Sequence, residues 1–303
     1  MKYTIHNQKF GVEIETAGCE RKRIAEAIKT IVNGRVTQEF GTFQASLVTQ
    51  PDGRIWRVQN DASITTIRGH KGSEIVSPIL TYDDIPTLQL IIIAVKGIGC
   101  IAHRSCSVHV HVDATPHTAQ SLTNLAKMVY RNEDLLFQAI GTSPERRAHY
   151  TKPMEQEFID RLLQSKPDTM TDLNRAWYGH ANQNPQHYDQ SRYRGLNYNN
   201  LYRSIHTIEF RYFQASLNSE RITSWIQLVL AMSAKALDLK KTTHSKIETD
   251  NPKFNFRVFM VAGLGMKGNE FKTARTILLK NLPGNSAWRY GKPQKNTEVA
   301  NVQ

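Results

Sequence analysis

The sequence predicts an α+β protein built around a mostly antiparallel sheet. Its strand-like segments alternate apolar and polar residues, as antiparallel strands with one covered face do, whereas buried parallel strands are apolar throughout. Two of these segments are joined by the turn sequence Pro51-Asp52-Gly53, which predicts a hairpin. Strands and helices are mixed along the chain. Together these observations favour an α+β sheet over a doubly wound parallel one.

The first half of the chain contains segments with a period of two residues and segments with a helical period. In "FGVEIET" the apolar residues Phe10, Val12 and Ile14 alternate with polar ones, which predicts a strand. The next segment repeats apolar residues at i, i+3, i+4, i+7 and i+8, which predicts an amphipathic helix. In order, we expect a strand at 10–16, a helix at 21–32, a hairpin at 45–59, a short strand at 73–76 stopped by Pro78, a helix from 84 to about 97 and a strand at 107–113.

The second half is expected to be mostly helical, with one further strand. Residues 165–200 are rich in Asn, Gln, Tyr and Pro and show little periodic apolar signal, so they predict a long polar loop or lid. The other elements expected are helices at 121–140 and 155–164, a strand at 206–214, a helix at 222–237, and a basic helical C-terminal part with Phe271, Ile277, Leu278 and Leu282 in its core.

The domain prediction is a single domain over residues 1–290, whose basic helical part begins at about 240, followed by a polar tail at 291–303. The 303 residues would allow two domains, but one domain on a large sheet also reaches this length. With 40% hydrophobic and 22% charged residues, the composition excludes collagen-like, disulfide-scaffold and broadly disordered classes.

The sequence indicates a cytoplasmic protein without a membrane segment. The N-terminus lacks the apolar region of a signal peptide, and the longest apolar run, at 90–95, is far shorter than the roughly 20 residues of a membrane helix. Cys19, Cys100 and Cys106 are too few and too irregularly spaced for a disulfide framework or a zinc site, so we expect reduced thiols.

The net charge of +12 is concentrated near the C-terminus, where residues 240–303 hold 12 basic and 4 acidic residues. A basic segment can bind nucleic acid or another polyanion through counterion release, but it is more often solvated surface. No zinc-finger, helix-turn-helix or RNA-recognition motif accompanies it, so a nucleic-acid partner stays an alternative without a motif.

Polar residues on several predicted strands would share one face of a sheet. In 107–113 the valines oppose His109, His111 and Asp113, because side chains alternate along a strand. In 206–214 the same rule sets Ile208, Phe210 and Tyr212 against Glu209, Arg211 and Phe213. If these strands form one sheet, its polar face gathers Glu13, Glu15, Asp61, Glu74, His109, His111, Glu209 and Arg211.

Such a face is too acidic to be covered without neutralisation, because close carboxylates raise each other's pKa and cost stability. Bound cations resolve this, and magnesium fits best, since it prefers hard oxygen ligands with room for water or phosphate. Arg211 is suited to hold a phosphoryl oxygen. The alternatives are a solvated polar face and a structural Glu209–Arg211 ion-pair network.

Six motifs also resemble, in the same order, those of the amidoligase family, a branch of the glutamine synthetase and glutamate-cysteine ligase superfamily of carboxylate-amine ligases. The resemblance spans Phe10 to about Arg289. The motifs are "FGVEIE", "DASI" followed by "GSEIVSP", "SVHVHVD", "RYRGLNYNNL", "TIEFRYFQASLN" followed by "SWIQL", and "LPGNSAWR". The resemblance implies a curved antiparallel sheet like that of the glutamine synthetase catalytic domain, with helices on one face.

By this resemblance, residue roles fall on the matching positions. The expected metal ion is Mg²⁺, with Mn²⁺ as the alternative. Its expected ligands are Glu13, Glu15, Asp61, Glu74, His109 and Glu209. ATP contacts are expected from Glu15, His109, His111, Arg194, Asn197 and Arg211, and catalysis from Arg211 and Glu209. The chain departs from the family pattern at Ser107 and Ser216, and neither change replaces an expected ligand.

The implied reaction is the formation of an amide or isopeptide bond from a carboxylate and an amine through an acyl phosphate made from ATP. The segment 165–200 is the expected lid. The substrates, small molecules or polymers, are not named by the sequence, and family members are often associated with glutamine amidotransferase-like partners. Two alternatives stay open: a phosphotransferase of guanidino-kinase type on the same fold, and a metal-dependent nucleic-acid-binding protein or nuclease.

Overall fold

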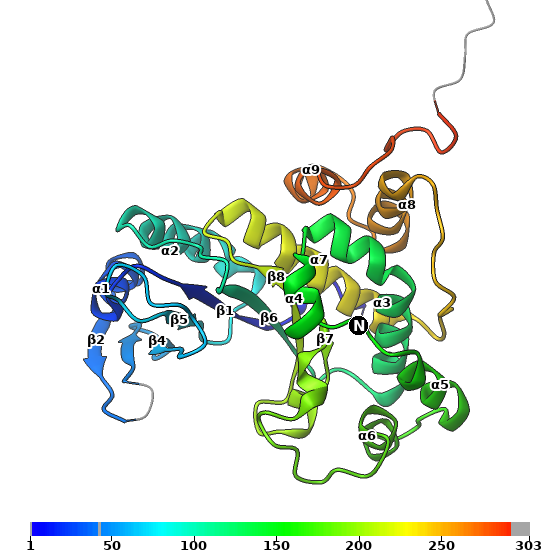
Figure 1. Ribbon diagram of the computed structural model, residues 1–303, viewed down its shortest axis with the longest axis horizontal. Coiled ribbons are helices and arrows are strands. Elements are labelled where there is room, and N and C mark those ends of the chain that lie inside the picture. The colour runs from blue at the N-terminus through cyan, green and yellow to red at the C-terminus, as the bar shows by residue number, and fades with distance from the viewer. Residues whose placement is uncertain (1, 42–43, 292–303) are drawn as a thin grey trace, which may run out of the picture.

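One antiparallel sheet organises the molecule, and it confirms the predicted α+β class. The computed structural model describes residues 2–41 and 44–291. Eight strands form an open sheet in the order β2-β3-β4-β5-β1-β6-β8-β7, with every neighbouring pair antiparallel (Figure 1). The strands are β1 (Phe10–Thr16), β2 (Arg35–Gln38), β3 (Ser46–Thr49), β4 (Ile55–Asn60), β5 (Ser73–Val76), β6 (Ser107–Asp113), β7 (Leu196–Asn197) and β8 (Thr207–Gln214).

Three helices cover the apolar face of this sheet. Helix α1 (Arg21–Val32) packs on β3 and β4, α7 (Ser219–Asp238) packs on β6, and α2 (Ile85–Gly97) lies between α1 and α7 (Figure 1). Helix α3 (Ala119–Ile140) packs against α7 and β8, and α5 (Gln156–Ser165) and α6 (Met170–Tyr178) pack against α3. The short α4 (Pro144–His149) follows α3. No helix within 2–41 and 44–291 combines the length and apolarity needed to cross a membrane.

The alternation read from the sequence explains which face is covered. In β1 the side chains of Phe10, Val12 and Ile14 are almost fully buried and belong to the main hydrophobic core. The register places Val12 opposite Val110 and Ile14 opposite Val108, so apolar residues of neighbouring strands meet on the helix side. The opposite face is therefore left to the polar residues.

A bulge in β8 corrects one strand prediction. The register runs from Val108↔Phe213 to Val110↔Phe210, so two residues of β8 oppose the single residue His109 of β6. Phe213 consequently joins the valine face and stacks on Trp225 of α7, with ring centroids 4.9 Å apart. Its predicted place beside Glu209 and Arg211 is wrong, because strict alternation does not survive the extra residue.

The predicted loop at 165–200 is also wrong over much of its length. It contains α6, two short 3-10 helices at 190–193 and 199–202, and strand β7. Leu173 and Trp177 of α6 are buried, and Trp177 contacts the ring of Phe158 edge to face. The apolar positions of α6 run from Met170 to Tyr178, about two and a half turns, and the polar segment that follows hides this short periodic signal. Elements β2 and α4 are likewise absent from the prediction.

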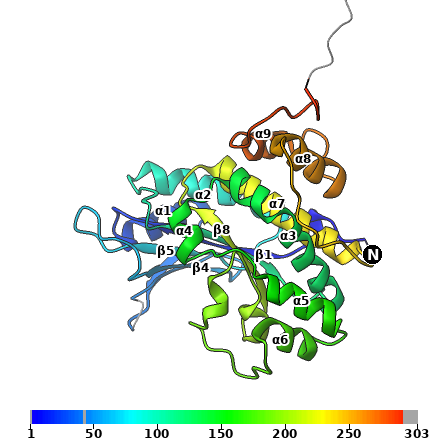
Figure 2. The same cartoon turned by 45° about the vertical axis from the view of Figure 1, so that its right-hand side comes forward.

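The C-terminal part is helical, as expected, and forms an outer layer. Helix α8 (Pro252–Val258), a π-helical turn (Phe259–Gly263) and α9 (Lys272–Leu279) follow α7, and Figure 2 shows α8 and α9 beyond α7 on the side away from the sheet. Three of the predicted core residues, Phe271, Leu278 and Leu282, are buried, and Ile277 is half-buried. The predicted polar tail, except Gly291, lies outside the described residues.

Candidate functional site

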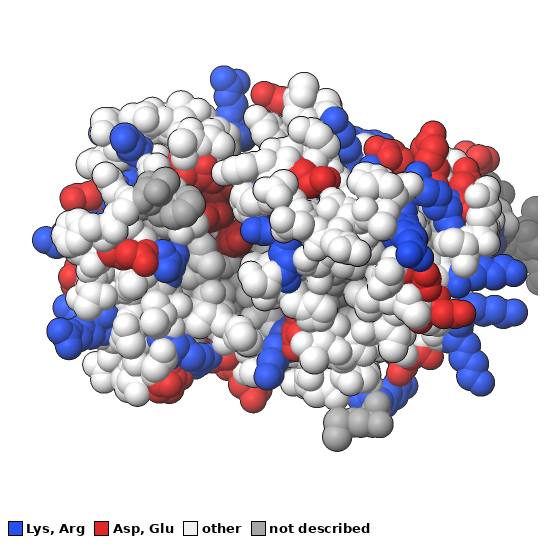
Figure 3. Space-filling model, turned by 90° about the horizontal axis from the view of Figure 1, so that it is seen from below, with Lys and Arg blue, Asp and Glu red and all other residues white. Residues whose placement is uncertain are grey.

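Strand register brings the predicted polar residues together on the face of the sheet opposite α1, α2 and α7. Antiparallel partners lie directly across from one another, so their side chains are neighbours. The pairs are Glu13↔His109, Glu15↔Glu74 and His111↔Glu209. In Figure 3 acidic side chains lie in a hollow of the molecular surface, with basic side chains along its side.

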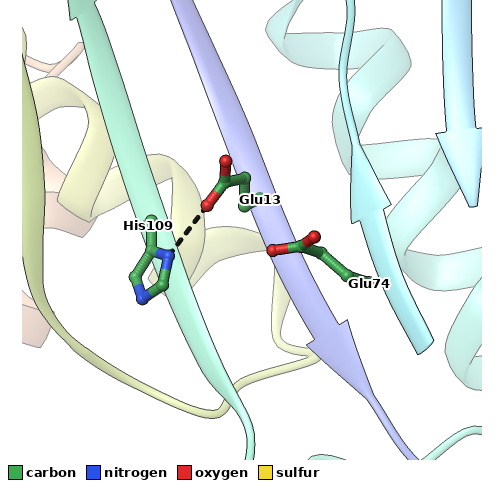
Figure 4. Close-up of side chains that lie close together, drawn as sticks. All are labelled: Glu13, Glu74 and His109. Carbon is green, nitrogen blue, oxygen red and sulfur yellow. Dashed lines mark hydrogen bonds and ion pairs between the residues drawn. The ribbon is translucent and has the colours of Figure 1, made fainter. Parts of the chain in front are cut away.

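Among the described residues, three overlapping groups have ligand atoms within 4.8 Å of one another, which is close enough to share a metal ion. They are Glu15–Asp61–Glu74, Glu13–Glu74–His109 and Glu13–His111–Glu209. Figure 4 shows the middle group, in which Glu13 from β1, Glu74 from β5 and His109 from β6 converge. Because Glu13 and Glu74 each belong to two groups, the three candidate sites form a row.

Glu13 is held between two histidines. His109 Nδ1 lies 2.9 Å from Glu13 Oε2, and His111 Nε2 lies 3.3 Å from Glu13 Oε1. Ser107 Oγ lies 3.1 Å from His109 Nε2, and Thr207 Oγ1 lies 3.0 Å from His111 Nδ1. Ser107, one of the two departures from the family pattern, therefore orients an expected metal ligand. Such hydroxyl contacts fix ring orientation, as the supporting partners of metal-bound histidines do.

Glu209 is the most tightly held carboxylate of the site. It is 2% exposed and pairs with Arg211, and its Oε2 accepts hydrogen bonds from Asn197 Nδ2 at 2.6 Å and Asn200 Nδ2 at 2.9 Å. Asn197 lies on β7, opposite Glu209 in the register. Three donors thus fix both oxygens of one buried carboxylate, which leaves the group pre-organised beside His109 and His111.

The environment pushes the carboxylate pKa values in opposite directions. Burial alone would raise the pKa of Glu209, but Arg211 and the two histidines lower it to about 2. Burial is likewise outweighed at Glu13, where His111 and His109 hold the pKa well below its usual range. Burial and the neighbouring charges of Glu13 and Glu15 raise the pKa of Glu74 well above its usual range. The ionised form of Glu74 is therefore disfavoured when no cation is present.

The donor set fits a hard divalent cation. Carboxylate oxygens dominate all three groups, and only two imidazoles contribute nitrogen, which suits magnesium or manganese better than zinc. His111 Nε2 is buried and has only the ion-pair contact with Glu13 Oε1 at 3.3 Å among the described residues, so a cation bound by Glu13 would lie within its reach. The raised pKa of Glu74 shows that the cluster carries more carboxylates than the protein itself neutralises.

A cavity of about 440 Å³ adjoins one end of the row. It shares Glu13 and His111 with the third ligand group, and Val76, Pro78, Ile79 and Ile205 add an apolar lining. Ile79 and Ile205 are exposed although they are large and apolar. Pockets with an apolar wall and a few polar groups at one end are typical binding sites for organic molecules.

The eight side chains predicted to share a face lie together, and Asn197 joins them through Glu209. Arg194 does not join them: its Nη2 pairs with Glu155 at 2.6 Å and its guanidinium lies over the ring of Trp177. Sequence reasoning missed Asn200, although it lies in the quoted motif "RYRGLNYNNL". It also missed the buried Arg146 of α4, for which no local pattern exists.

The fold and the site define an α+β protein with an acidic, histidine-containing candidate metal centre on an open antiparallel sheet. A family model described as "putative amidoligase enzyme" matches residues 6–233, which is most of the chain and includes every residue of the site. The chain therefore belongs to this family, and membership assigns it to the amide-bond-forming ligases. A search of the curated proteins found no match.

Proposed function

We propose that the protein is an ATP- and Mg²⁺-dependent carboxylate-amine ligase of the glutamine synthetase and glutamate-cysteine ligase superfamily. The observation that carries the proposal is the row of three ligand groups with Arg211 paired to its innermost carboxylate. Several divalent ions and a guanidinium around one hollow are what transfer of a phosphoryl group from a polyphosphate requires. Family membership supplies the amide-forming half of the reaction.

In this proposal Glu13, Glu15, Asp61, Glu74, His109 and Glu209 hold the ions. The ions neutralise the charge of the ATP phosphates and of the group in transfer. The substrate carboxylate attacks the γ-phosphorus of ATP, so an acyl phosphate forms and ADP leaves. An amine then attacks the acyl carbon and loses a proton to the solvent, an amide bond forms, and inorganic phosphate leaves with the electrons of the broken C–O bond.

The protein's own contribution is position and charge. Glu209, held by Asn197 and Asn200, orients Arg211 so that its guanidinium charge stands beside the ligand row. The pKa of Arg211, which burial alone would lower, is raised by Glu209 and Glu13, so the group stays charged. The cavity beside Glu13 and His111 is the proposed place for the organic part of a substrate or nucleotide.

The first test measures ADP release from Mg-ATP with a panel of amino acids, polyamines, peptides and nucleic acids. Release by the wild type should require both a carboxylate and an amine. Glu209→Gln should lower it by about 100-fold or more, because the carboxylate that orients Arg211 loses its charge. Glu26→Gln on α1, with a half-exposed side chain outside the site, is the matched control and should retain the activity.

The products separate the alternatives. ADP with the phosphoryl group retained on a guanidino acceptor would indicate a phosphotransferase, and cleavage of nucleic acid without ATP would indicate a nuclease. Failure of the wild type to bind or turn over Mg-ATP would contradict the ligase proposal. The identity of the substrates, a glutamine amidotransferase-like partner and a cytoplasmic location stay predictions.

A further inference from the structure

Arg146 is a buried cation that lacks a partner within residues 2–41 and 44–291. Its residue exposure is 7%, and its Nε and Nη2 are fully buried without a hydrogen-bond partner among the described residues. It makes no ion pair with a carboxylate of that part of the chain, and the nearest aromatic contact is the Tyr150 ring, 5.9 Å from Cζ. Buried guanidinium groups are almost always paired, so this arrangement calls for an explanation.

The backbone connects this side chain to the candidate site. Thr151 N donates to Arg146 O at 3.0 Å, Gly195 N donates to Lys152 O at 3.0 Å, and Arg211 N donates to Gly195 O at 2.7 Å. The segment that follows α4 therefore runs beside the residues that lead into β7 and on to Arg211 in β8. These bonds hold α4 next to the end of the sheet that carries Arg211.

Charges at the site act on Arg146. Burial lowers its pKa, the Glu15 carboxylate raises it, and the like charge of Arg211 lowers it. Arg211 also has a buried Nε without a hydrogen-bond partner among the described residues, since only its Nη1 is bonded to Glu209. Two guanidinium groups with unused buried N–H groups thus lie within electrostatic range of the same carboxylate, Glu15, as well as of each other.

We propose that Arg146 and Arg211 form an oxyanion subsite beside Glu15, which takes a substrate carboxylate or a phosphoryl group. Guanidinium N–H groups match both anions in geometry. Arg211 is paired with Glu209, whereas the buried charge of Arg146 has no counter-charge among the described residues and is compensated only when the anion is present. The assignment of the anion to a ligase reaction rests on the proposed function; the anion site itself does not.

The test compares Arg146→Gln with Arg147→Gln. Arg147 is the next residue of the same helix, but its side chain is 40% exposed and pairs with Asp134, so it is a matched control. Calorimetric titration of the full-length protein with inorganic phosphate represents the phosphoryl source, and L-glutamate represents the carboxylate source. Arg146→Gln should weaken binding of at least one anion about tenfold or more, as loss of a charge-assisted hydrogen bond does. Arg147→Gln should bind as the wild type does.

The thermal midpoint without ligand separates this role from a structural one. Removal of a buried, unpaired charge should leave the midpoint of Arg146→Gln equal to or above that of the wild type, whereas loss of a structural residue lowers it. Arg146→Lys keeps the positive charge but not the planar pair of N–H donors, so it should bind the anion more tightly than Arg146→Gln does and less tightly than the wild type.

Unchanged affinity for both anions in Arg146→Gln, or no binding of either anion by the wild type, would overturn the subsite. A lowered midpoint with unchanged affinity would assign Arg146 to the fold. If Arg146→Gln loses binding of only phosphate or only L-glutamate, that result identifies whether the subsite takes a phosphoryl group or a carboxylate. Anion binding that depends on Arg146 in a protein that does not turn over Mg-ATP would uphold the subsite and reject the ligase proposal.

Discussion

Glu133 shows how a single buried residue supports the site without taking part in it. Its side chain is inaccessible to solvent and accepts hydrogen bonds from Tyr212 Oη at 2.7 Å and Met154 N at 2.9 Å. Tyr212 follows Arg211 in the bulge of β8, so α3 is bonded to the strand at the point where the guanidinium leaves it. Burial raises the pKa of Glu133 from 4.5 to about 7.

This pKa predicts how stability depends on pH. Between pH 4.5 and about 7 the folded protein retains the Glu133 proton and the unfolded chain does not, so a rise in pH favours unfolding. The contribution of Glu133 to stability is therefore fully present below pH 4.5. The stabilisation is lost as the pH rises toward about 7. The loss is on the order of 3 kcal/mol at most.

Glu133→Gln keeps an acceptor for both donors but cannot titrate. The free energy of unfolding should therefore fall less between pH 4.5 and 7 in the variant than in the wild type, as measured by urea denaturation at several pH values. Parallel pH profiles in the two proteins would show that Glu133 does not carry the expected change.

At the scale of elements, the joint between β7 and β8 decides the geometry of the site. Gly195 precedes β7, and a Cβ atom there would lie 2.1 Å from Cε1 of Tyr212. The glycine lets the ring pass close to the backbone, while Arg211 N donates to Gly195 O at 2.7 Å. The turn into β7 and the bulge of β8 therefore fit each other only when residue 195 has no side chain.

Gly195→Ala should displace the Tyr212 ring and destabilise the fold by about 1–3 kcal/mol, the range for overpacking a close-packed interior. It should also lower ligase activity, because the displaced bulge carries Arg211. Gly97→Ala at the end of α2, where nothing lies within 4 Å of the added methyl group, should be neutral or slightly stabilising. Equal urea midpoints for both variants would contradict the close fit.

At the scale of the whole molecule, the +12 net charge contrasts with a site that is locally acidic. The sheet gathers carboxylates from β1, β5 and β8 and from Asp61 after β4 onto one face, while α1, α2 and α7 cover the other face. Burial and the charges of Glu13 and Glu15 together raise the pKa of Glu74, so a bound cation that offsets these charges should stabilise the fold.

Mg²⁺ or Mn²⁺ should therefore raise the thermal midpoint of the wild type relative to EDTA. At an ion concentration of 100 times the dissociation constant, the free energy of unfolding should rise by about 2.7 kcal/mol. Glu74→Gln should not lower the EDTA midpoint, because burial and the neighbouring carboxylates disfavour the ionised form that the substitution removes. It should lose most of the shift caused by the ion, because Glu74 belongs to two of the three ligand groups. A shift of wild-type size in the variant would exclude Glu74 as a ligand.

The sequence by itself determined the class of fold and the membership of the polar face. Period-two alternation in 10–16 and 107–113 assigns Glu13, Glu15, His109 and His111 to one side, because successive side chains of a regular strand point to opposite faces. Helices α1, α3 and α7 were predictable for a similar reason, since their apolar periodicity extends over several turns.

Only the tertiary structure decided which of those residues touch. The register sets Glu13 across from His109, the bulge turns Phe213 to the core, and packing buries the side chain of Arg146 in α4. Each of these depends on contacts between segments far apart in the chain. A local pattern carries no information about such contacts, because they arise from the packing of strands and helices that the chain pairs only when it folds.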